Sequence, residues 1–120
     1  MGVTGLLEKT SRPKSLFGTC TQEEVGCGHL LITINGNGHG PTEVFATLGK
    51  AGGCSSCQNE ALTRTITLGL RYGLPAMEFI NELEGIQCPN PKMFPQDDRC
   101  LSCPDAIAKA LRNYIKGQGK

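Results

Sequence analysis

The chain has 120 residues, the length of one domain with a thin core, and it lacks tryptophan. Its formal net charge is +1, from 12 basic and 11 acidic residues, and no run of Lys or Arg is longer than two, which argues against strong non-specific binding to nucleic acid. No segment approaches the roughly 20 consecutive apolar residues that a membrane-spanning helix needs.

The first half of the chain predicts an arm followed by a β-hairpin. Residues 1–24 are polar, contain Arg12-Pro13 and show no sustained period, so we expect an N-terminal arm or linker. A β-branched run at residues 30–34 leads into a turn-rich segment at 35–41, and residues 43–48 suit the returning strand. Glycines at residues 49–53 break that strand.

The second half predicts three helices. In the first helix, one face at helical spacing is formed by residues 61, 62, 65, 66, 69, 70 and 73, with Ser55 or Ser56 as a cap. A shorter helix carries Met77, Ile80 and Leu83 on one side. A proline-rich loop at residues 86–101 precedes a last helix that opens at Pro104-Asp105. Its apolar face consists of Ile107, Ala108, Leu111, Tyr114 and Ile115.

These elements predict an α+β fold, in which a small antiparallel β-hairpin or sheet packs against about three helices. We expect the domain to span residues 25–116, between the arm at 1–24 and a tail at 117–120. Glycine and proline make up much of the rest, so aliphatic packing alone should not stabilise it.

The seven cysteines are the strongest feature of the sequence. An odd number argues against a closed disulfide framework, and residues 1–9 lack the pattern of a secretory signal. We therefore expect a cytoplasmic protein whose thiols stay reduced, and clustered cysteines then indicate metal binding or redox chemistry. Cys20 lies apart from the others, in the predicted arm.

Two cysteine pairs have the spacing of metal-binding knuckles. Cys54 with Cys57 and Cys100 with Cys103 are both C-x-x-C pairs, which together could form a four-cysteine zinc site. The alternative chemistry is dithiol/disulfide exchange. Cys54 and Cys103 are expected near helix N-termini, where the helix dipole stabilises a thiolate.

Four motifs follow one another along the chain: Gly26-Cys27-Gly28-His29-Leu30, EVFATLGKAGGC at residues 43–54, Gly85-Ile86-Gln87-Cys88-Pro89 and LSCPDAIAKAL at residues 101–111. Arg12-Pro13, Leu16 and Gly18 precede them. Together they resemble the TSCPD domain, over about residues 12–112. This domain ends many class II (adenosylcobalamin-dependent) ribonucleotide reductases and also occurs in short stand-alone proteins.

The resemblance implies a different ligand set from the two knuckles. The recurring cysteines of the family correspond to Cys27, Cys54, Cys88 and Cys103, so these would bind the metal. Zn²⁺ is the expected ion, with an iron–sulfur cluster as the alternative. Cys57 and Cys100 fall where the family commonly has small or apolar residues, so they would form a redox pair, substitute as ligands, or pack.

The resemblance also implies a function. The catalytic body of a class II reductase is several times longer than this chain, so the chain would bind no cobalamin and would not catalyse alone. It would be an accessory module, with a reductase catalytic subunit or another protein as its partner. The alternatives are a thiol relay to a reductase through the C-x-x-C pairs and a binding module for nucleic acid or an iron–sulfur cluster.

Other candidate residues have simpler explanations. Lys50, Gly52 and Gly53 precede a predicted helix and could bind an anion, although these glycines also suit close packing around Cys54. His29 could replace a thiolate ligand but equally suits the edge of a strand. His39 lies in a turn and should be solvated.

Overall fold

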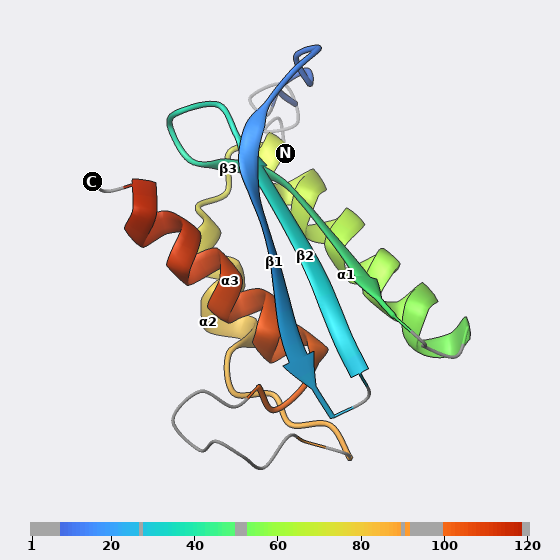
Figure 1. The fold of residues 1–120 in the computed structure, drawn as a ribbon. Helices are drawn as coiled ribbons and strands as arrows, with labels where there is room; N and C mark the ends of the chain where they lie inside the picture. The colour runs from blue at the N-terminus through green and yellow to red at the C-terminus, as the bar shows by residue number, and fades with distance from the viewer. Residues whose placement is uncertain (1–7, 27, 50–52, 90, 92–99, 119–120) are drawn as a thin grey trace, which may run out of the picture.

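The computed structural model describes residues 8–26, 28–49, 53–89, 91 and 100–118. Three strands precede three helices, and the strands form one antiparallel sheet of order β1-β2-β3 (Figure 1). The elements are β1 (Phe17–Val25), β2 (Gly28–Gly36), β3 (Pro41–Leu48), α1 (Gly53–Arg71), α2 (Ala76–Leu83) and α3 (Cys103–Gln118). The predicted α+β class is confirmed.

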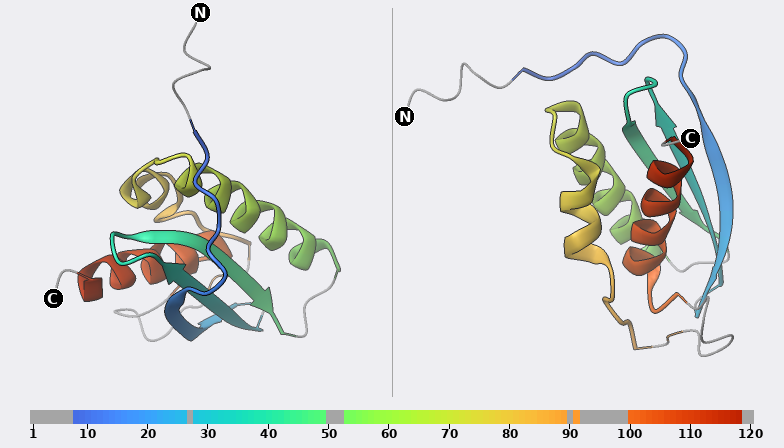
Figure 2. Two further views of the ribbon diagram at one scale, coloured as in Figure 1. Left: turned by 90° about the horizontal axis from the view of Figure 1, so that it is seen from above. Right: turned by 90° about the vertical axis from the view of Figure 1, so that its left-hand side faces the viewer.

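The helices lie on one side of the sheet, and the other face of the sheet is open (Figure 2). Helix α3 packs beneath the strands, α2 lies behind α3, and α1 runs along β3. In β2, the buried Leu30, Ile32 and Ile34 face the helices, while Leu31 is 43% exposed on the open face. The predicted apolar face of α3 is buried or partly buried in the same core.

Helix α1 covers the outer edge of β3 through one threonine. The Val44 N–H donates to the Thr67 hydroxyl at 3.0 Å, and that hydroxyl also lies 3.2 Å from the Val44 carbonyl. The side chain thereby takes the place of a neighbouring strand. Free backbone groups at a sheet edge invite pairing with other chains, so this contact protects β3.

The predicted inner face of α1 is only partly correct. Ile66 and Leu70 are buried as expected, but Ala61 and Thr65 are exposed. Asn59 and Thr63 are buried instead, and the Thr63 hydroxyl donates to the Asn59 carbonyl at 3.0 Å. The helix packs against the side of the sheet, and its buried face is rotated toward these polar residues. Met77 of α2, predicted on an apolar face, is also exposed.

Strand β1 was not predicted, because residues 17–24 were assigned to the arm. It pairs with β2 in unbroken register from Phe17↔Gly36 to Val25↔Gly28. Only Val25 is buried, so the strand lacks the alternation of apolar and polar residues by which strands are recognised. Its backbone pairing with β2 defines it instead.

Gly18 should be irreplaceable in β1, because an added Cβ would overlap the Ile34 carbonyl and Asn35 of β2. We expect Gly18→Ala to lower the free energy of unfolding by about 1–3 kcal/mol, as overpacking against rigid backbone does. The matched control is Gly117→Ala in α3, whose Cβ meets nothing within 4 Å and should leave stability equal or slightly higher. Chemical denaturation measures both, and equal stabilities would contradict this account.

Candidate metal centre

The segments that carry Cys88 and Cys103 are held together by hydrogen bonds. The Cys88 N–H donates to the Leu101 carbonyl at 3.1 Å, and the Ser102 hydroxyl donates to the Ile86 carbonyl at 2.6 Å. Cys88 and Cys103 are both half-buried. Two of the four predicted ligands therefore lie on chain segments that are fixed relative to each other.

The carboxylate of Asp105 completes this clamp. It accepts hydrogen bonds from the Gly85 N–H at 2.8 Å, the Leu101 N–H at 2.9 Å and Lys109 Nζ at 2.6 Å. Asp105 is fully buried. Burial raises the pKa of its carboxyl, but the hydrogen bonds from Lys109, Gly85 and Leu101 outweigh burial and hold that pKa below its usual value.

Cys103 is the first residue of α3, at a well-formed helix start. Ser102 is the N-cap, and its hydroxyl accepts the Asp105 N–H at 3.1 Å. A thiolate at this position is stabilised by the positive end of the helix dipole. Ser102 and Asp105, on either side of Cys103 and Pro104, thus fix the cysteine at the N-terminus of a helix.

The flanks of the other two predicted ligands reach the same end of the molecule (Figure 1). The Cys100 thiol, which is 2% exposed, lies 4.0 Å from Oε1 of Glu23 and so joins the end of β1 to the start of α3. The Gly49 N–H donates to the His29 carbonyl at 3.0 Å, which places the end of β3 beside the start of β2. Helix α1 begins four residues later, at Gly53.

The described residues cover only part of the predicted site. Cys27, Lys50, Gly52 and the side chain of Cys54 lie outside them, as do those contacts of Gly53 that an anion would need. Within the described ranges, no group of three or more His, Cys, Asp or Glu side chains is placed to bind a metal. The four-cysteine set and the anion-binding loop therefore stay predictions.

The remaining candidates are dispersed. Cys57 is exposed on α1, and Cys20 is exposed on the open face of β1, where the Thr33 hydroxyl donates to its sulfur at 3.4 Å. His29 is exposed beside Gln22, and His39 is exposed in the β2–β3 turn. Cys88 and Cys103 fit thiolate coordination, since both are partly accessible and held by backbone contacts.

A comparison with protein families decides the relationship of this chain. The family model described as the TSCPD domain matches residues 7–115 of the 120-residue chain. The chain belongs to the TSCPD-domain family. Searches of curated proteins and of solved structures found no match to it. In the described part of this TSCPD domain, no helix is long and apolar enough to cross a membrane.

Glu43, a residue of the second motif, is a buried carboxylate that the sequence gave no reason to single out. Arg12 binds it through two nitrogens at 2.8 and 3.1 Å, Asn35 Nδ2 donates to it at 2.7 Å, and Arg71 Nη2 lies 3.2 Å away. Burial raises the pKa of the Glu43 carboxyl, and these donors, Arg12 foremost, lower it further than burial raises it. The Thr10 N–H also donates to the Arg71 carbonyl, so the arm is bound to the domain.

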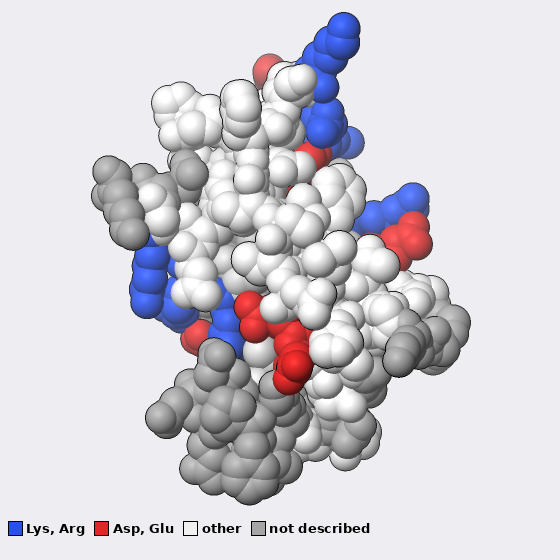
Figure 3. All heavy atoms as spheres, viewed as in Figure 1, with Lys and Arg blue, Asp and Glu red and all other residues white. Residues whose placement is uncertain are grey.

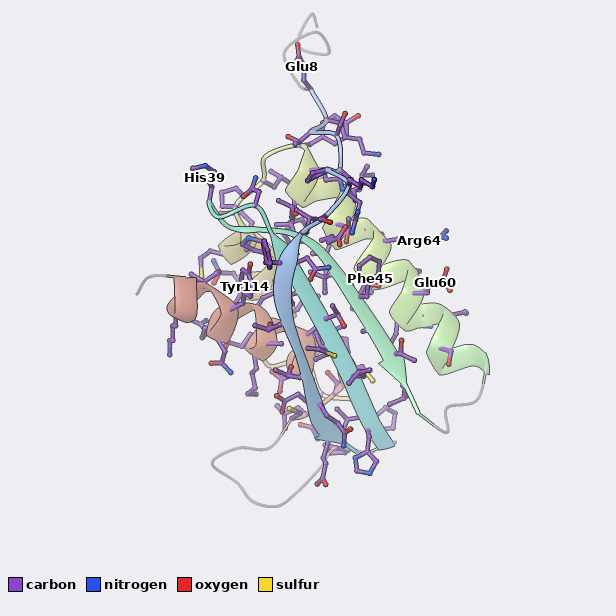
Figure 4. All side chains as sticks on the ribbon, turned by 45° about the horizontal axis from the view of Figure 1, so that its top comes forward. Glu8, His39, Phe45, Glu60, Arg64 and Tyr114 are labelled. Atoms are coloured by element: carbon purple, nitrogen blue, oxygen red, sulfur yellow. The ribbon has the colours of Figure 1, made fainter. Side chains whose placement is uncertain are left out.

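A groove of about 500 Å³ separates the outer faces of β3 and α1. Phe45, which is 51% exposed, lies between the strand and the helix, and Glu60 and Arg64 project from α1 (Figure 4). Two of the cations that line the groove are neutralised, because Arg64 pairs with Glu60 and Arg71 pairs with Glu43. The groove is therefore poorly suited to an anion.

The two buried carboxylates should make stability depend on acid pH. Folding lowers the pKa of both groups, so their contribution is complete above their unfolded pKa values of about 4 and is lost as the pH falls through the folded values. We expect Asp105→Asn to cost about 2–4 kcal/mol at pH 7 and to flatten the fall in stability between pH 5 and pH 3. Denaturation at a series of pH values measures both effects.

Glu60→Gln is the control for this experiment, because it removes an exposed carboxylate from a surface ion pair. Its stability should follow that of the wild type at every pH. A pH profile of Asp105→Asn that is parallel to the wild-type profile would show that Asp105 is not bound as described.

Proposed function

We propose that this TSCPD domain is a zinc-binding accessory module of the ribonucleotide-reductase type, acting in the cytoplasm and not catalytic by itself. Cys27, Cys54, Cys88 and Cys103 would hold the ion. When bound, Zn²⁺ would supply a structural cross-link between four chain segments, worth on the order of 10 kcal/mol in small zinc domains. The partner would be a reductase catalytic subunit, and the chain itself would bind no cobalamin.

The observation that carries this proposal is the clamp between residues 85–88 and 101–105. Buried hydrogen bonds with no catalytic purpose fix the backbone around Cys88 and Cys103. Ligand orientation by neighbouring hydrogen bonds is typical of protein metal sites. Family membership supports the same reading, and the described residues contain no constellation that suggests hydrolytic or transfer chemistry.

The alternatives receive less support. A thiol relay through Cys100 and Cys103 needs a first cysteine that a partner can reach, whereas Cys100 is 2% exposed and Cys103 is the more accessible of the two. A role in binding nucleic acid is disfavoured by the net charge of +1. An iron–sulfur cluster would use the same thiolates, and its visible absorption would distinguish it from zinc.

Zinc content of cysteine variants tests the ligand set. We expect one Zn²⁺ per wild-type chain by elemental analysis, loss of zinc and of stable folding in Cys103→Ser, and full zinc in Cys20→Ser, since Cys20 is exposed on β1. Cys57→Ser and Cys100→Ser should retain zinc, because these residues are outside the proposed set.

Two results would contradict this set. Zinc-free wild-type protein, purified without chelator, would remove the metal from the proposal. Loss of zinc in both Cys57→Ser and Cys100→Ser would instead assign the site to the two C-x-x-C knuckles.

The reductase assignment has its own test. Gel filtration of the zinc-loaded chain with the catalytic subunit of a class II reductase from the same organism should show co-elution. Separate elution at micromolar concentrations would contradict the reductase partner while leaving the zinc site intact.

A further inference from the structure

The two edges of the sheet are treated differently. Helix α1 covers the edge of β3 through Thr67, whereas along the outer edge of β1 the described part of the chain places no element. The main neighbours of β1 are β2 and α3, and Figure 2 shows it as the outermost strand. Of its nine residues only Val25 is buried, and Phe17 is 89% exposed.

The direction of the free backbone groups follows from the contact at the opposite edge. Val44 directs its N–H and C=O to α1, so its partner Ile34 must direct its own groups to β1, because groups alternate along antiparallel strands. Thr19, opposite Ile34, therefore pairs with β2. The backbone groups of Cys20 and Gln22, one residue out of phase with Thr19, point away from the sheet.

Strand β1 lacks the features by which exposed edges usually avoid pairing. Its sequence FGTCTQEEV contains no Lys, Arg or Pro, and its register with β2 has no bulge. Its two charges, Glu23 and Glu24, are confined to its last third. A long regular edge without such protection is a template for an added strand.

Helix α3 provides a platform for that strand. It passes beneath the sheet and continues beyond β1 (Figure 1). Near the first residues of β1, a hollow of about 540 Å³ is lined by Phe17, Gly36 and Tyr114. Helix α3 also carries Lys109, Arg112 and Lys116, and basic side chains gather on this side of the molecule (Figure 3).

These features exclude a second copy of the chain as the occupant. Symmetric pairing of two β1 strands would bring a second α3 beneath the added strand, where the first α3 already lies. A single extended segment from another protein has no such conflict. The basic residues of α3 favour acidic side chains on the face of the segment that lies over the helix.

We propose that the outer edge of β1 binds an extended, acidic segment of a partner protein by adding it as a fourth strand over α3. Backbone hydrogen bonds to Cys20 and Gln22 supply the pairing, an apolar side chain fills the hollow beside Phe17, and acidic side chains face α3. This surface involves none of the proposed zinc ligands, so it stands or falls apart from the metal site.

A model peptide tests the proposal on the full chain. The probe is a capped peptide as long as β1 with alternating valine and glutamate, titrated against ¹⁵N-labelled protein. We expect saturable shifts of the Cys20 and Gln22 amide signals, and affinity roughly fivefold to tenfold weaker for the valine–lysine peptide. No shift at β1 at millimolar peptide, or shifts confined to α1 and β3, would overturn it.

Two variants localise the effect. Gln22→Pro removes an N–H that faces away from β2, so it should spare the fold and abolish binding, while Gln22→Ala should bind like the wild type. Lys116→Glu, at an exposed position of α3, should bring the affinities of the two peptides together or reverse their order. Unchanged binding by Gln22→Pro, or an unchanged preference in Lys116→Glu, would overturn the proposed mode.

Discussion

The carboxylate of Asp105 is the interaction on which the lower end of this domain depends. It is fully buried and is satisfied by two backbone N–H groups and one ammonium group, which come from the end of α2, the entry to α3 and α3 itself. Such a group stabilises only while all its donors remain, because an unpaired buried carboxylate is costly. It therefore makes the positions of the Cys88 and Cys103 segments interdependent.

Glu43 has the same role at the opposite end of the sheet. It binds the arm through Arg12, the end of α1 through Arg71 and strand β2 through Asn35. The apolar core between these ends is made largely of Ile, Leu, Val and Ala, with Tyr114 its one buried aromatic side chain among the described residues. Two buried charge clusters and the proposed zinc site thus supplement a core that is small for its many loops.

The sequence predicted those elements that bury an apolar face. The hairpin and the last helix follow the periods of their apolar residues, and the described helices begin and end close to the expected positions. Strand β1 was missed because pairing, not burial, defines it, and the face of α1 was misplaced because Asn59 and Thr63 are buried there. The ligand set came from a family resemblance, since C-x-x-C spacing alone favoured Cys57 and Cys100, while the roles of Asp105 and Glu43 needed three-dimensional contacts.

The measurement that most directly tests the account is X-ray absorption at the zinc edge of the protein as purified. Four cysteine thiolates predict a single shell of four sulfur atoms at about 2.3 Å, with no nitrogen or oxygen in the first shell. A spectrum with two or more nitrogen or oxygen ligands near 2.0 Å, or protein without zinc, would contradict the proposal that four cysteines hold this TSCPD domain together.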